Sequence, residues 1–266
     1  MRFRFLALAA LAAALLTSAG PAQAEISTTG TFNFSVGTTA PSGAYWSGGH
    51  GDIDVHEHDP VNDPGHWEIH YHFHSEVTSG TAGYPTGGNG FPGTPEVHDG
   101  ENEWKWEAGD LKLWLNTSGS GTTLTQPSGA QWAFTGVTDG QSLYVLPASP
   151  TEGVPYLGFS AHDFATTYTL GAVTGGHISA WTVDGFGTPT ALWSSFNPSL
   201  TVNNNSLLIP AGSHAHVFLG FSQQGDFTAA ITAVPEPTSM ALAAFGAVGL
   251  AGGAMLRRRR RLQLQK

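Results

Sequence analysis

Histidine is the residue type whose number and spacing in this sequence point most directly to chemistry. Seven of the twelve histidines lie between His50 and His74, and a further pair, His214 and His216, flanks a single alanine. From residue 66 onward, histidine or glutamate alternates with large apolar residues, as in His70-Tyr71-His72-Phe73. Because successive side chains of a β-strand point to opposite faces, this alternation predicts a strand with an apolar face and an imidazole-rich face.

The preceding segment shows the same alternation. Ile53 and Val55 share one parity, and the other parity holds Asp52, Asp54, His56 and His58. Residues 59–65 read Asp-Pro-Val-Asn-Asp-Pro-Gly, which is a run of turn formers. We therefore predict a β-hairpin, with its two polar faces side by side.

Such a hairpin has the geometry to bind a metal ion. Opposed side chains of paired strands have Cβ atoms roughly 4.5–5.5 Å apart, and imidazole nitrogens bind zinc at about 2.0–2.1 Å. Imidazole suits zinc, copper and nickel, whereas calcium and magnesium prefer oxygen ligands. We expect His70 and His72 to bind such an ion, with help from His50, His56 or the pair His214 and His216. The complete set of candidate metal ligands is His50, Asp52, His56, His58, His70, His72, His74, His214 and His216.

The competing interpretation is an amphipathic hairpin whose solvent-facing histidines are bonded to neighbouring carboxylates. The isolated histidines His98, His162 and His177 are interpreted as structural.

Composition limits the classes of function. The chain has no cysteine, which excludes disulfides, thiolate metal sites and a catalytic cysteine. Between Glu25 and Thr232 there are nineteen acidic residues but only two basic ones, Lys105 and Lys112, so the formal charge of this part is −17. Such a charge repels phosphate backbones, and nucleic-acid binding is not expected.

The first 24 residues have the pattern of a signal peptide. Arg2 and Arg4 precede an apolar run over 5–16, and Ala22-Gln23-Ala24 has the small-x-small form of a cleavage site. We expect export, removal of residues 1–24 by a signal peptidase, and a mature chain that begins at Glu25.

The C-terminal region, 234–266, has the pattern of a membrane anchor. An apolar stretch over 240–256 is at the short limit for a transmembrane helix, and five arginines at 257–261 would hold its end on the cytoplasmic side. With Pro235-Glu236-Pro237 before it, this region resembles the PEP-CTERM sorting signal of Gram-negative bacteria. The resemblance implies processing by an exosortase, anchoring at the cell envelope, and a possible association with extracellular polysaccharide.

Between these ends, residues 25–233 predict a single all-β domain, an antiparallel sandwich or barrel-like fold. Short runs of Val, Ile, Phe, Trp and Tyr recur between turn residues, with little sign of a long helix. A Gly- and Pro-rich segment over 79–100 is predicted to be a surface loop. The predicted strands are 30–36, 51–58, 66–77, 110–116, 132–137, 142–146, 177–184, 206–209, 216–221 and 227–233.

The domain resembles the choice-of-anchor M family of surface-anchored proteins. The resemblance spans about 45–232 and rests on short segments that occur in the same order, including 49–53, 67–72, 143–147, 154–158, 185–189 and 212–216. Some members of that family accompany metal-uptake ABC transporters, but the resemblance implies no reaction.

Two hypotheses of different classes follow. The first is a non-catalytic surface protein whose histidine face binds a transition metal. The second is a structural, adhesive or polysaccharide-binding envelope module with incidental histidines, in which tryptophans such as Trp104 and Trp106 could stack on sugars. A metalloenzyme is a weaker alternative: His70, His72 and Glu76, with His214, resemble the metal motifs of the cupins, but the spacings differ.

Overall fold

The computed structural model describes residues 27–43, 45–59, 63–73, 96–98, 101–151, 154–162, 164–185 and 187–236. The predicted signal peptide and the apolar stretch over 240–256 lie outside these residues. Among the described residues, none of the helices has the length and apolar character needed to cross a membrane. Ser27–Thr238 group by their contacts into one compact unit.

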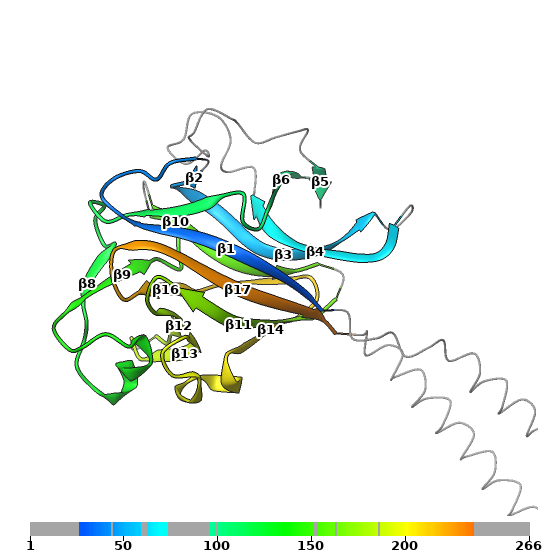
Figure 1. Ribbon diagram of the computed structural model, residues 1–266. Coiled ribbons are helices and arrows are strands. Elements are labelled where there is room, and N and C mark those ends of the chain that lie inside the picture. The colour runs from blue at the N-terminus through cyan, green and yellow to red at the C-terminus, as the bar shows by residue number, and fades with distance from the viewer. Residues whose placement is uncertain are drawn as a thin grey trace, which may run out of the picture. The chain divides into compact units, whose positions relative to one another are not determined.

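Three sheets make up this unit (Figure 1). In spatial order, the first sheet contains β14 (Ser206–Ile209), β11 (Thr166–Thr174), β17 (Gly225–Pro235), β1 (Thr28–Gly37), β7 (Lys112–Asn116) and β2 (Tyr45–Trp46). The second contains β15 (Ser213–His216), β10 (Pro155–Ala161), β3 (Gly49–Asp59), β4 (Asp63–Phe73), β6 (Glu101–Glu107) and β5 (Glu96–His98). The third contains β13 (Pro189–Ser194), β12 (Ile178–Val183), β16 (Phe218–Phe221), β9 (Ser142–Leu146) and β8 (Thr123–Thr125). The structure also has three short 3-10 helices in the described residues: η2 (Ala130–Thr135), η3 (Pro198–Leu200) and η4 (Val202–Asn204).

The all-β prediction is confirmed, but the sheets are not wholly antiparallel. β1 pairs in parallel with β7, β2 with β7, and β3 with β10. A parallel pair needs a long crossover instead of a tight turn, and about a hundred residues separate β3 from β10. In the described part of the chain each sheet keeps two edge strands, so the barrel-like alternative is wrong.

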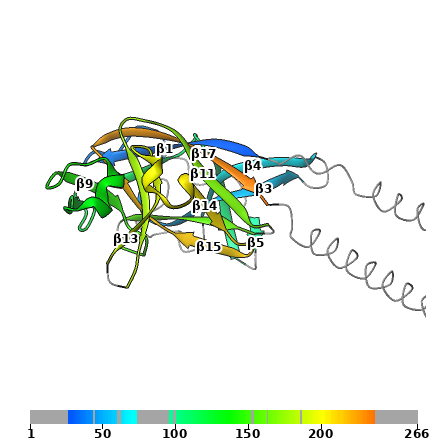
Figure 2. The same cartoon turned by 90° about the horizontal axis from the view of Figure 1, so that it is seen from below.

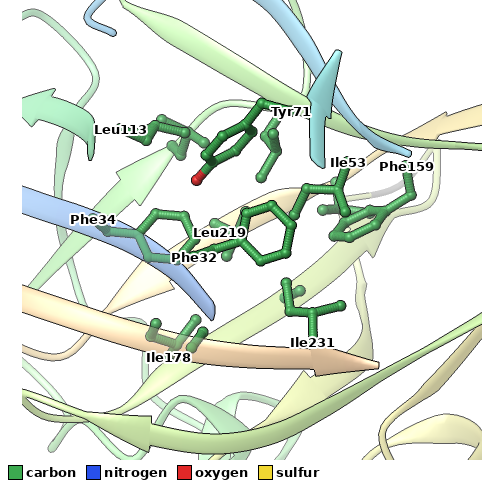
Figure 3. Packing of buried hydrophobic residues seen from close by; sticks show 14 of the residues in the cluster. Phe32, Phe34, Ile53, Tyr71, Leu113, Phe159, Ile178, Leu219 and Ile231 are labelled. Carbon is green, nitrogen blue, oxygen red and sulfur yellow. The ribbon is translucent and has the colours of Figure 1, made fainter. Parts of the chain in front are cut away.

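Alternating burial explains how the sheets pack together. On β1, Phe32, Phe34 and Val36 are buried, and β17 lies beside this strand in antiparallel register (Figure 2). Figure 3 shows side chains from all three sheets in one core, among them Phe32 and Phe34 of β1, Ile53 of β3, and Ile178 and Leu219 of the third sheet. This core fixes the apolar face of the β3–β4 hairpin, and with it the direction of the opposite, polar face.

Several predicted strands match the structure, and some do not. Residues 142–146 and 206–209 coincide with β9 and β14. The strand predicted at 132–137 is wrong, because most of this segment belongs to η2, which lies between Gly129 (φ 121°) and Gly136 (φ 70°). These left-handed glycines allow the sharp entry and exit that a strand would not need. The loop predicted over 79–100 contains β5. The strands that were not predicted are β2, β5, β6, β8, β10, β11, β13 and β15.

The last strand continues into the predicted sorting signal. Pro235 is the final residue of β17 and lies opposite Thr166 of β11. Beyond it, the Glu236 amide donates a hydrogen bond to the Ala165 carbonyl oxygen over 2.6 Å, and the Thr167 hydroxyl donates to Glu236 Oε1 over 3.0 Å. β17 therefore extends two residues beyond residue 233, and the side chain of the next residue, Glu236, is exposed.

We expect the Phe32→Ala substitution to lower the free energy of unfolding by about 3–5 kcal/mol, because it leaves a cavity in the shared core. Phe32 is fully buried and packs edge-on against Tyr71 with 4.9 Å between ring centroids. The matched control is Leu208→Ala, which truncates a side chain that is 54% exposed and should change stability by less than about 0.5 kcal/mol. Urea denaturation with chelator present checks both values, and equal losses would contradict this account of the core.

Candidate metal centre

The polar face of the β3–β4 hairpin is buried where it carries Asp52, Asp54, His70 and His72. In the antiparallel register, Asp52 lies opposite His72 and Asp54 opposite His70, so all four side chains share one face as predicted. Their exposed fractions are 1%, 1%, 0% and 2% respectively. The competing interpretation expects solvent-facing histidines bonded to carboxylates. The two histidines at these positions are buried, and bonds between histidines and carboxylates are present at Asp52 and Asp54.

Two further strands extend this face. Gly158 of β10 lies opposite both Asp52 and His216, and Ser160 lies opposite His214. His162 follows the end of β10 with the same parity as these two residues. Of the eight histidines whose side chains the structure describes, seven lie along this four-strand face, and His177 lies elsewhere, against Phe196. The sheet thus brings together histidines from three distant parts of the sequence.

Asp54, His56, His72 and His162 form the first group, which we call the Asp54 cluster. Asp54 Oδ2 lies 2.6 Å from His56 Nε2, 2.8 Å from His162 Nε2 and 3.4 Å from His72 Nδ1. The four ligand atoms all lie within 4.8 Å of one another. The carboxylate is fully buried, while His56 and His162 keep side-chain exposures of 14% and 17%. The four ligand atoms are therefore enclosed, while the His56 and His162 rings are partly exposed at the edge of the cluster.

The donor set fits a borderline divalent metal. Four ligand atoms at about 2.0–2.1 Å from a tetrahedral zinc ion lie about 3.3 Å from one another. Asp54 Oδ2 lies 2.6–3.4 Å from the three nitrogens, and no two of the four atoms are more than 4.8 Å apart, so small side-chain movements would complete the geometry. Three imidazoles and one carboxylate suit zinc, copper or nickel better than calcium or magnesium.

The electrostatics of the cluster favour a cation. Burial alone would raise the pKa of Asp54, but the contacts from His162, His56 and His72 outweigh burial and hold it well below the ordinary 3.8. Burial raises the pKa of Tyr168 well above its usual value, and the charges of Asp54 and Asp52 raise it further. Lys112, the one lysine or arginine whose side chain is described, pairs instead with Asp226 at 3.1 Å. The carboxylate is thus ionised and ready to bind a metal at neutral pH.

His50, Asp52 and His216 form the second group, which we call the His50 cluster. His50 Nε2 lies 3.0 Å from Asp52 Oδ1 and 2.9 Å from His216 Nε2. The His50 ring stacks on Tyr156 with 4.6 Å between centroids. A Cβ atom at Gly158 would lie 1.9 Å from Asp52 Oδ1, so the absence of a side chain at this position makes room for the carboxylate.

The predicted ligands divide between the two clusters. His56 and His72 belong to the Asp54 cluster, and His50, Asp52 and His216 to the His50 cluster. His70 belongs to neither group, and its ring stacks on His56 with 5.0 Å between centroids. His214 is exposed beside His216. The side chain of His58, and all of His74, lie outside the described residues.

Sequence reasoning missed two members of the Asp54 cluster. Asp54 was placed on the correct face, but it was not included among the ligands. His162 was interpreted as structural, and the structure places its Nε2 atom 2.8 Å from Asp54 Oδ2. The sequence did contain a usable pattern. In the run from Tyr156 to His162, every second residue lies on the same face of the sheet as the polar face of the hairpin.

Asp54 should stabilise the metal-free protein in a pH-dependent manner. Because its folded-state pKa is lowered, its contribution is fully present above the unfolded-state pKa of about 3.9 and is lost as the pH falls through the lower folded value. With chelator present, we expect Asp54→Asn to cost about 1–3 kcal/mol at pH 5–7, and this difference to shrink only below about pH 4.

Asp226→Asn is the matched control, because this carboxyl also has a lowered pKa, through Ser35 and Lys112, but its side chain is 64% exposed. It should cost less than about 1 kcal/mol. Denaturant titrations across the pH range measure both differences, and an Asp54→Asn protein as stable as the wild type at pH 6 would contradict the electrostatic account.

Comparison with known proteins bears on the C-terminal part of the chain. Residues 233–261 match the family model described as the PEP-CTERM protein-sorting motif. This match begins inside β17, so the motif starts within the folded domain. No curated protein and no solved structure matches the chain. The motif indicates an exported protein that is sorted to the envelope of a Gram-negative bacterium.

Proposed function

We propose that this exported, surface-sorted protein binds one borderline divalent metal ion, zinc, copper or nickel, at the Asp54 cluster. The observation that carries the proposal is the convergence of three imidazole nitrogens, within 3.4 Å, on one oxygen of a fully buried carboxylate. A buried charge is costly unless it is paired or coordinates a metal, and this carboxylate is surrounded by the side chains that a metal would also bind.

The cluster favours binding over catalysis. Its four protein donors would fill a tetrahedral coordination shell, as in structural zinc sites, whereas catalytic sites keep one position for water or substrate. A non-catalytic role in holding or buffering the metal outside the cytoplasm therefore accounts for this donor set better than a cupin-like reaction.

The anchoring of the protein is a further part of the proposal. The PEP-CTERM motif supports processing by an exosortase-type enzyme. We propose that residues 1–24 are removed by signal peptidase and that 240–256 holds the protein in the membrane with its domain outside. The resemblance to the choice-of-anchor M family, some members of which accompany metal transporters, is consistent with a role in metal handling.

The alternative of a polysaccharide-binding module has less support in the described residues. Trp46, Trp181 and Trp193 are buried almost completely, and Trp106 is 9% exposed. None of the tryptophans whose side chains are described is exposed, whereas a sugar-stacking platform needs open indole faces.

Removing two ligands of the Asp54 cluster should abolish binding there. In untagged protein, we expect His72→Ala combined with His162→Ala to lose one bound ion per chain and the stabilisation that this ion supplies. At a free metal concentration a hundred times the dissociation constant, that stabilisation is roughly 2.7 kcal/mol. Affinity should also fall as the pH drops through about 6, since protons compete for imidazole.

His177→Ala is the matched control, because its ring contacts Phe196 and it belongs to neither cluster, and it should leave binding unchanged. Isothermal calorimetry and elemental analysis measure these results. If the wild type binds zinc, copper and nickel no tighter than ~100 μM, near −5.5 kcal/mol, the metal proposal fails.

The sorting motif gives a separate test. Changing Pro235, Glu236 and Pro237 to alanine should leave the domain folded, since Glu236 is exposed and Pro235 ends its strand, but should prevent anchor processing in the native host. The control Thr167→Val removes the hydroxyl that bonds to Glu236 without changing the motif, and should be processed normally. Immunoblots of envelope fractions report processing, and normal processing of the alanine variant would refute this role.

A further inference from the structure

We propose that the His50 cluster is a second metal site, with three protein ligands and one coordination position open to water or a small anion. Its residues are distinct from those of the Asp54 cluster, so the inference does not depend on whether the first site is filled. The ligands are His50 and Asp52 of β3 and His216 of β15, which lie on either side of β10.

The ligand atoms of this cluster lie close together. His50 Nε2 is the central atom, 3.0 Å from Asp52 Oδ1 and 2.9 Å from His216 Nε2. Ligands of one tetrahedral ion lie about 3.3 Å apart. Since no two of the three ligand atoms are more than 4.8 Å apart, small side-chain movements would place all three around a single ion. His50 and Asp52 are also buried, at 6% and 1% exposure, which limits competition from bulk water.

The surrounding residues hold this arrangement in place. Tyr156 lies parallel to the His50 ring, at an interplanar angle of 1°, and edge-on to His216. Gly158 lies between the strands that carry the ligands, and a side chain there would overlap Asp52 and approach His216 Cδ2 to 2.9 Å. The positions of the three ligands are therefore built into the packing of β3, β10 and β15.

The number of ligands distinguishes this site from the Asp54 cluster. Among the described residues this cluster has three protein donors, which leaves the fourth tetrahedral position to an external ligand, the arrangement of exchangeable and reactive zinc sites. One carboxylate against a divalent ion leaves a net positive charge, and a bound cation is the largest local charge in such a site. A small anion is thus the favoured external ligand. The exposed His214 lies beside His216, with 5.0 Å between ring centroids.

Cobalt(II) is the probe that separates the two sites, because its visible absorption reports the coordination shell. The wild type should bind two cobalt ions, and sodium azide should alter the spectrum. His50→Ala with His216→Ala should leave one ion whose spectrum azide does not change. His72→Ala with His162→Ala should leave one ion whose spectrum azide does change. His177→Ala should behave as the wild type.

Circular dichroism checks that each variant is folded, and His216→Gln provides a milder removal of the same nitrogen ligand, with the same expected loss of one azide-sensitive ion. The inference is overturned if either second-site variant still binds two ions, or if azide perturbs the remaining cobalt after His50 and His216 are changed. Failure of the first site alone gives a different result: the wild type then binds a single, azide-sensitive ion.

Discussion

The buried carboxylate of Asp54 is the constraint on which the rest of this structure depends. An ionised group with no exposed surface is strongly destabilising unless nearby groups replace its hydration. Here three imidazoles replace it, and their effect on the pKa of Asp54 exceeds the effect of burial. Imidazoles are also metal ligands. The side chains that stabilise the buried carboxylate in the metal-free protein are therefore the ones that could bind a cation beside it.

The sheet assembles these ligands without a long or specialised loop. The β3–β4 hairpin supplies Asp54, His56 and His72, and its opposite face is held by the aromatic core that joins all three sheets. The parallel pairing of β10 with β3 then places His162 beside Asp54, although about a hundred residues separate them. β15 completes the row by placing His216 across Gly158 from Asp52. Because the apolar faces of these strands pack in the core, the ligands on their polar faces are held in fixed positions.

Local alternation in the sequence was enough to predict the hairpin and the face on which its histidines lie, because strand parity is a local property. Burial of that face was not predictable, since alternating histidines such as His70 and His72 can lie on a solvent-exposed strand face as well as on a buried one. The division into two clusters also depends on which strands neighbour β3, and the parallel partner β10 has no local signal that assigns it to this position. The contact between His162 and Asp54 was not predicted for this reason. The strand predicted at 132–137 was wrong for a different reason. This apolar segment lies between two glycines with positive φ, and most of it forms a 3-10 helix.

Anomalous diffraction at the metal absorption edge, on crystals of the zinc-loaded protein, tests the central claim most directly. We expect a strong peak at the point enclosed by Asp54 Oδ2, His56 Nε2, His72 Nδ1 and His162 Nε2, about 2.0–2.1 Å from each atom. The inference of a second site predicts a further peak beside His50 Nε2. Well-ordered crystals of metal-loaded protein without a peak at the Asp54 cluster would contradict the account.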